Sequence, residues 1–149
     1  MEKEKAFSRM KTVKILVMDA QGGGLGKQIV SLVKKNYPEV YIMAVGTNTM
    51  ATSAMLKAGA DEAATGENAV RVASRHADVI MGPVGIVIAD AMLGEITPGM
   101  ACAVAQADAK RILVPFNNCD NYIVGINENG IGKMVDEAVE HLKTILDNE

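Results

Sequence analysis

Apolar runs and helical patterns alternate along the chain, which is the pattern of an α/β protein. Runs typical of buried strands occur at residues 13–19, 41–45, 62–64, 79–81 and 110–114. Apolar residues spaced three or four apart predict helices at residues 25–36, 49–58, 69–77, 97–107 and 131–146. The strands are short and apolar, which indicates burial on both faces. We therefore expect an α/β fold: a Rossmann-like three-layer sandwich with a mostly parallel sheet.

Two segments are harder to interpret from the pattern. Residues 84–93 are almost wholly apolar, and we interpret them as a buried helix because a strand has just ended at Pro83. Residues 122–126 are a candidate for a further strand that pairs with 110–114. Helix starts are clearer, since Asn48 and Thr97 are both residues that cap helix N-termini. Glu95 is also interpreted as a capping residue.

Length and composition limit the class of protein. The 149 residues predict a Rossmann-like single domain over 12–149, after a charged leader over 1–11 that is expected to be disordered. The net charge is −3, and no basic patch with interleaved aromatics indicates nucleic-acid binding. Apolar runs fall short of the roughly 20 residues that span a bilayer, so no membrane partner is expected. Two cysteines without a CxxC pair favour free thiols and a cytoplasmic location.

The chemistry is concentrated in the glycine-rich stretch 21–27, Gln-Gly-Gly-Gly-Leu-Gly-Lys. It follows a predicted strand that ends at Asp19, and it leads into a predicted helix. A strand, a glycine turn and a helix in this order aim backbone N–H groups and a helix N-terminus at an anion. We therefore predict a ligand that carries a phosphate group.

The stretch matches two nucleotide motifs imperfectly. The dinucleotide pattern G-x-G-x-x-G would use Gly22 and Gly24, but Lys27 stands where a small residue is needed. The P-loop pattern needs glycine at Gln21 and a hydroxyl residue at Gln28. The dinucleotide interpretation fits better, so the predicted function is binding of a nucleotide or dinucleotide such as NAD(P).

Ligands of such folds bind outside the carboxyl ends of the strands. This rule selects the candidate binding residues Asp19, Gln21, Gly22, Gly23, Gly24, Lys27, Gly46, Thr47, Asn48, Gly82 and Pro83. The second strand lacks the terminal acidic residue that usually binds an adenosine ribose, which weakens an assignment to NAD. Lys27 is either a phosphate contact or a solvated lysine.

Other polar residues have competing interpretations. Asp19 is either functional or a carboxylate that accepts N–H groups of the glycine turn, and the second interpretation is favoured. Asp90 is either a site residue or exposed. If the protein is an enzyme, Asp19, Asp90 and Asn118 are the residues to test. Cys119 lacks a placed base, and no cluster has the spacing of metal ligands.

Several motifs in order carry a resemblance to a known family. They are residues 19–24, 46–48, 51–60, 65–69, 82–86 and 92–95, and together they extend over nearly the whole chain after the leader. The chain resembles a small uncharacterised bacterial domain family of unknown function that is common in anaerobic Firmicutes. The resemblance implies a Rossmann-like fold and a bacterial cytoplasmic protein, and it implies no activity.

Two alternatives to ligand binding alone stay open. The chain is a candidate for a regulatory or scaffold subunit, in which the glycine turn is structural and the apolar segment 84–93 packs in a homo-oligomer. It is also a candidate for a small NAD(P)-dependent oxidoreductase, although it is short for a dehydrogenase with a separate substrate domain.

Overall fold

The centre of the fold is a parallel sheet of five strands in the order β3-β2-β1-β4-β5. The computed structural model describes residues 1–116, 121–126 and 130–148. The strands are β1 (Lys14–Asp19), β2 (Tyr41–Gly46), β3 (Glu62–Thr65), β4 (Val79–Pro83) and β5 (Lys110–Val114). Every pair of neighbouring strands is parallel. This arrangement confirms the predicted α/β class and its parallel sheet.

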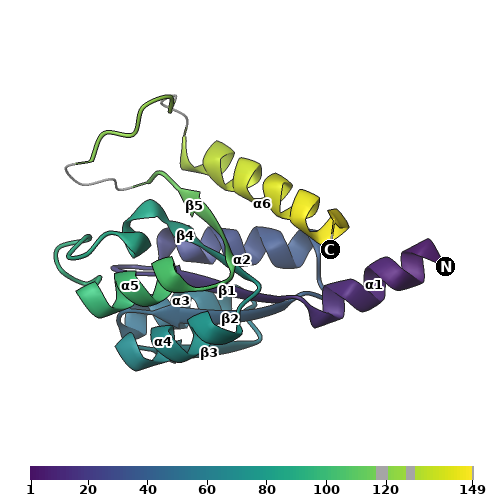
Figure 1. Cartoon of the computed structure of the whole chain (residues 1–149), viewed down its shortest axis with the longest axis horizontal. Helices are drawn as coiled ribbons and strands as arrows, with labels where there is room; N and C mark the ends of the chain where they lie inside the picture. The colour runs from purple at the N-terminus through teal and green to yellow at the C-terminus, as the bar shows by residue number, and fades with distance from the viewer. Residues whose placement is uncertain (117–120, 127–129, 149) are drawn as a thin grey trace.

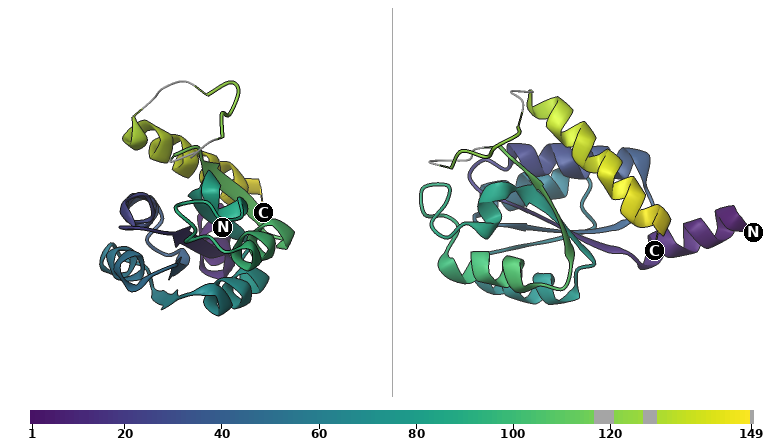
Figure 2. Two further views of the ribbon diagram at one scale, coloured as in Figure 1. Left: turned by 90° about the vertical axis from the view of Figure 1, so that its left-hand side faces the viewer. Right: turned by 45° about the horizontal axis from the view of Figure 1, so that its top comes forward.

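Helices cover both faces of the sheet (Figure 1; Figure 2). One face carries α2 (Gly24–Asn36), α3 (Thr49–Lys57) and α6 (Ile131–Asn148), and the other carries α4 (Glu67–His76) and α5 (Pro98–Gln106). The sheet therefore separates two apolar cores. Successive residues of β1 alternate between them, with Ile15 and Val17 in one and Leu16 and Met18 in the other.

The predicted helix starts are confirmed. The Asn48 side chain accepts a hydrogen bond from the backbone N–H of Ala51 at 2.9 Å, and the Thr97 hydroxyl accepts one from Met100 at 3.1 Å. Each cap satisfies an N–H group that has no partner inside its own helix. Pro98 occupies the first turn of α5, where its missing N–H group costs nothing.

The prediction of a buried helix over 84–93 was wrong. A single 3-10 turn, η1 (Val84–Val87), follows β4, and the chain then forms a compact loop over 88–96. Backbone bonds close this loop, including one from the N–H of Asp90 to the carbonyl of Ile96 at 2.8 Å. The segment is apolar because its side chains anchor the loop to the core: Ile86 and Ile96 are fully buried beneath α5.

The two ends of the chain contain further differences from the sequence predictions. The leader, which was expected to be disordered, forms helix α1 (Glu2–Thr12), which extends from the end of the sheet opposite the glycine turn (Figure 1; Figure 2). The described stretch 121–126 contains a turn and no strand, and Tyr122 and Val124 expose most of their side chains. These apolar residues contribute nothing to the sheet, so their pattern was misleading. Within the ranges described, no helix combines the length and the apolar character needed to cross a membrane.

Candidate functional site

The glycine turn lies at the point where the strand order reverses. Strand β1 has β2 on one side and β4 on the other, and the chain reaches β4 only after completing β3. Ligands of open α/β sheets bind at this switch point, outside the carboxyl ends of the strands. A cavity of about 140 Å³ lies there. It is lined by Asp19, Ala20, Gln21, Gly22, Gly23, Gly24, Leu25, Gln28, Pro83, Met92, Phe116 and Ile131.

Asp19 ties the end of β1 to the start of α2. One carboxylate oxygen accepts a hydrogen bond from the N–H of Ala20 at 2.8 Å, and the other accepts one from Gly26 at 2.7 Å. Gly23 at the N-cap of α2 has no side chain, so Asp19 supplies the carboxylate that caps the helix. The favoured interpretation of Asp19, a carboxylate that holds the turn, matches these contacts.

Burial controls the acidity of Asp19, which is only 4% exposed. Burial raises the pKa of its carboxyl group above the ordinary value, and the hydrogen bonds from Gly26 and Ala20 offset only part of this effect. The negative charge of Glu95 raises the pKa further. The site therefore contains a carboxylate whose charge is costly in the folded state.

The three glycines of the turn have different roles. Gly23 has a positive φ of 73°, and a Cβ atom there would lie 2.8 Å from the Cα atom of Ala51 in α3. Its place in the turn is therefore structural. A Cβ atom at Gly22 or Gly24 would meet no other atom within 4 Å. These two positions leave open space above the turn, through which a ligand can approach the backbone.

Glu95, which was interpreted as a capping residue, instead connects two turns at the carboxyl edge. Its Oε1 atom accepts hydrogen bonds from the backbone N–H of Gln21 at 3.0 Å, the hydroxyl of Thr47 at 2.8 Å and the amide of Asn48 at 2.8 Å. The Asn48 amide also donates to the carbonyl of Gln21 at 2.9 Å. The turns after β1 and β2 are therefore joined through a side chain from the loop 88–96.

The ionisation of Glu95 follows from these contacts. Burial raises the pKa of its carboxyl group, but the hydrogen bonds from Gln21, Thr47 and Asn48 outweigh burial and leave the pKa below its ordinary value. Glu95 is thus held as a carboxylate at neutral pH. Sequence reasoning missed its place because the residue is 48 positions from Thr47, and only the folded loop brings the two together.

Unusual backbone conformations are concentrated in the same two loops. Among described residues other than glycine, positive φ angles occur at Gln21, Asp90, Met92 and Leu93. Such conformations cost of order 1–3 kcal/mol each and persist where the surrounding structure enforces them. Met92 is buried and lines the cavity beside Pro83, whereas Leu93 at the tip of the loop is 96% exposed.

The remaining predicted residues lie at varying distances from the cavity. Lys27 is exposed on α2 and lines a separate hollow beside α3. Gly46 and Gly82 are buried where the chain is most crowded, and a Cβ atom at Gly82 would lie 2.4 Å from the carbonyl oxygen of Met18. Asp90 is exposed on the loop 88–96 rather than buried in an apolar helix.

The sequence predictions also concern Asn118, the two cysteines and metal binding. Asn118 and Cys119 lie outside the described residues. Cys102 is a free thiol and is exposed on α5. In the described part of the chain, no group of three or more His, Cys, Asp or Glu side chains is arranged to hold a metal ion.

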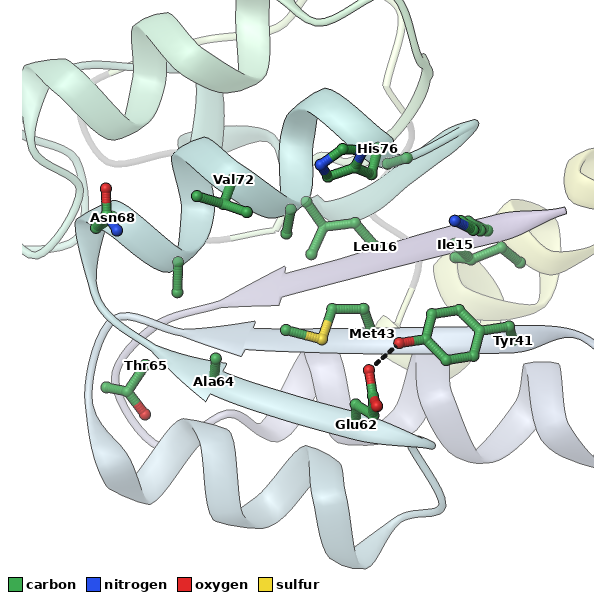
Figure 3. A pocket seen from close by; sticks show the side chains of 14 residues that line it. Ile15, Leu16, Tyr41, Met43, Glu62, Ala64, Thr65, Asn68, Val72 and His76 are labelled. Atoms are coloured by element: carbon green, nitrogen blue, oxygen red, sulfur yellow. Dashed lines mark hydrogen bonds between the residues drawn. The ribbon is translucent and has the colours of Figure 1, made fainter.

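A larger cavity, of about 820 Å³, lies on the face of the sheet that α4 covers. Figure 3 shows it between α4 and strands β1, β2 and β3, with Leu16, Met43 and Val72 along its length. At one end the Tyr41 hydroxyl donates a hydrogen bond to Glu62. Of the helices in the described ranges, α4 and α5 lie on this face, whereas α2, α3 and α6 lie on the other.

Comparison with known proteins places the chain in a family. The family model described as "Domain of unknown function (DUF3842)" matches residues 14–147. The chain belongs to this family. The match confirms the resemblance to an uncharacterised domain family, and its description states no activity for DUF3842 proteins.

The other comparisons add little about function. No curated protein matches the chain. Among solved structures, the chain is similar to the crystal structure of AibC, with a TM-score of 0.48 and 18% sequence identity over 95% of this chain and 47% of that one. The chain thus spans about half the length of that protein. The fold of this DUF3842 chain follows from its own sheet topology.

The turn glycines should differ in their sensitivity to substitution. Gly23→Ala should lower the free energy of unfolding by at least about 1–2 kcal/mol, because alanine is strained at positive φ and its Cβ atom meets Ala51. Gly24→Ala, at the open first position of α2, should change it by less than about 0.5 kcal/mol. Urea unfolding measures both. Equal effects for the two variants would contradict the structural role of Gly23.

The raised pKa of Asp19 predicts a pH dependence of stability. As the pH rises from about 4 through the raised pKa, the unfolded chain loses its Asp19 proton first, so the folded state binds more protons and stability falls. Asp19→Asn removes this contribution. The difference in unfolding free energy, wild type minus variant, should therefore decrease with pH over this range when measured by urea unfolding. A difference that rises with pH would contradict burial as the dominant influence on the Asp19 carboxyl group.

Proposed function

We propose that this DUF3842 protein binds a nucleoside phosphate, with the phosphate at the glycine turn. The observation that carries the proposal is the cavity at the β1/β4 switch point, which is lined by residues 19–25 at the N-terminus of α2. Its position is the one at which α/β sheets of this topology hold nucleotide phosphates. A cytoplasmic location, expected from the cysteine usage, remains a prediction.

The chemistry of the turn supports a phosphate. Gly22 and Gly24 leave room for a ligand to reach the backbone, and Gln28 adds a side-chain amide to the lining. The dipole of α2 favours an anion at this end of the helix. Because Asp19 already accepts the N–H of Gly26, a phosphate at this site would use the outer part of the turn.

The dimensions of the cavity favour one nucleotide over a dinucleotide. Pockets for whole small ligands usually measure about 300–1,000 Å³, so 140 Å³ accommodates a phosphate and leaves the rest of the ligand outside. On the β4 side, Met92 and Phe116 line the cavity next to Pro83, where the second half of a dinucleotide would lie. The edge of the sheet above β2 lies on the other side of the turn, and we expect the nucleoside of a single nucleotide to lie there. We therefore narrow the NAD(P)-like expectation to a nucleoside phosphate.

Thermal unfolding with a ligand panel tests the proposal. AMP, ADP, ATP and GTP at millimolar concentration should include a ligand that raises the melting temperature by several degrees, because binding at 100 times Kd stabilises by about 2.7 kcal/mol. Adenosine, which lacks the phosphate, should give a smaller shift. NAD and FMN complete the panel. The absence of a shift with every phosphate compound would overturn the proposal.

A charge placed in the open part of the turn tests the position of the phosphate. Gly22→Glu should abolish the nucleotide-dependent shift, because a carboxylate would then repel the phosphate at short range. Gly22→Gln is the matched control, with the same size and no charge, and it should retain a larger part of the shift. Since a side chain at this position meets open space, both variants should fold. Equal binding by the two variants would place the phosphate elsewhere.

The groove beside α4 favours a second candidate function, that of a regulatory or scaffold subunit which pairs with another copy of itself. Its apolar residues Leu16, Met43 and Val72 line a space that a two-fold contact could fill. Lys14 and Glu62 at the groove carry opposite charges, so the same surface on two copies can be complementary.

Light scattering tests this second candidate. Wild-type protein should have the mass of a dimer at micromolar concentration, and Val72→Glu should shift it toward the monomer by placing a charge in the apolar groove. Lys57→Glu on α3, across the sheet, is the control for added negative charge. A wild-type monomer at high concentration would exclude this assembly, while leaving nucleotide binding untouched.

A further inference from the structure

We propose that Glu95 binds the ribose 2′- and 3′-hydroxyl groups of the nucleoside phosphate and so selects ribonucleotides. This inference rests on the proposed function. Nucleotide-binding α/β folds usually place an Asp or Glu at the end of the second strand for this purpose. In this chain that position holds Gly46, Thr47 and Asn48, and the loop 88–96 supplies the carboxylate instead.

The Glu95 carboxylate lies between the two turns of the carboxyl edge that follow β1 and β2. Its three donors come from the turn after β1 and the turn after β2, so Oε1 lies between the phosphate-binding turn and the end of β2. A nucleotide whose phosphate lies at residues 22–24 and whose sugar extends over β2 would pass this point. A side chain could not replace Gly46, because a Cβ atom there would lie 2.5 Å from the backbone nitrogen of Thr52.

Glu95 has unused hydrogen-bonding capacity in the described part of the chain. Oε1 accepts three hydrogen bonds, whereas within the described ranges no donor reaches Oε2. The side chain is partly exposed, so a ligand can reach it. An ionised carboxylate only accepts hydrogen bonds, and a vicinal diol provides two donors. The chemistry of the free oxygen therefore matches a ribose edge.

The loop that carries Glu95 is held rigidly. The loop 88–96 is closed by backbone bonds from Asp90 to Ile96, from Gly94 to Asp90 and from Ile96 to Ala91, at 2.8, 3.1 and 3.2 Å. Ile96, which follows Glu95, is fully buried. The carboxylate is thus held in place before a ligand arrives, which lowers the entropic cost of binding. A solvated surface glutamate would have no such restraint.

A purely structural role for Glu95 predicts something different. If its three hydrogen bonds only fasten the loop to the two turns, loss of Glu95 would lower the affinity for every ligand by the same factor. Recognition of the ribose predicts instead a loss confined to ligands that carry the diol. The ratio of affinities for ribose and dideoxyribose ligands separates the two roles, because a change in stability leaves that ratio unaltered.

Calorimetric titration with ADP and 2′,3′-dideoxy-ADP provides this ratio. The wild type should bind ADP at least about tenfold more tightly than the dideoxy compound, as expected for hydrogen bonds to a charged acceptor. Glu95→Gln should reduce the ratio to about one. Asp90→Asn is the matched control on the same loop, because asparagine tolerates the positive φ at this position, and it should keep the wild-type ratio.

Each outcome bears on one of the two proposals. If the wild type binds ADP and dideoxy-ADP equally, the inference about Glu95 is wrong and the nucleoside phosphate proposal stands. If Glu95→Gln keeps the wild-type ratio, another group recognises the diol and the inference is again wrong. If neither compound binds and no phosphate compound of the thermal-unfolding panel does, the proposed function itself fails. Should Glu95→Gln not fold, Glu95→Asp, which retracts the carboxylate by one methylene, should lower the ratio in the same direction.

Discussion

The carboxylate of Asp19 is the interaction on which the candidate site depends. By accepting hydrogen bonds from Ala20 and Gly26, it joins the last residue of β1 to the first turn of α2 and fixes the path of the glycines between them. The contact requires a close approach, since a Cβ atom at Gly26 would lie 2.9 Å from the Cβ atom of Asp19. The open positions Gly22 and Gly24 are available to a ligand because the polypeptide around them is held by this side chain.

A second carboxylate gives the carboxyl edge its particular form. Glu95 gathers donors from two turns, and its pKa is lowered by their hydrogen bonds, whereas the pKa of Asp19 is raised by burial. The pKa values of these two neighbouring carboxyl groups are therefore shifted in opposite directions. One is buried and ties the helix to the strand, and the other is partly exposed with an oxygen to spare. This division supports a structural role for Asp19 and a ligand-facing role for Glu95.

Much of the architecture could be predicted from local patterns. The strand over Lys110–Val114, the caps at Asn48 and Thr97 and the periodic helix after Ile131 depend on residues that are neighbours in the sequence. The apolar segment after Pro83 could not be predicted in this way. Its residues are buried as anchors of a loop, and burial produces the same composition whether the backbone is helical or irregular. The apolar residues near Tyr122 misled for the opposite reason, because they remain exposed.

The sequence was sufficient for the parallel α/β class, the glycine turn after β1 and the position of Asp19 at its start, because the alternation of short apolar runs with helical patterns and the glycine turn are both local patterns in the chain. Tertiary structure alone decided which groups share the carboxyl edge. Glu95 contacts Thr47, which is 48 positions away, and Met92 lines the same cavity as Pro83 only because the loop 88–96 folds back over the edge. Such contacts depend on positive φ angles at Asp90, Met92 and Leu93, and this conformation is uncommon for methionine and leucine. The buried contacts of Ile86 and Ile96 hold the loop in this position, and these contacts cannot be predicted from a short-range sequence pattern.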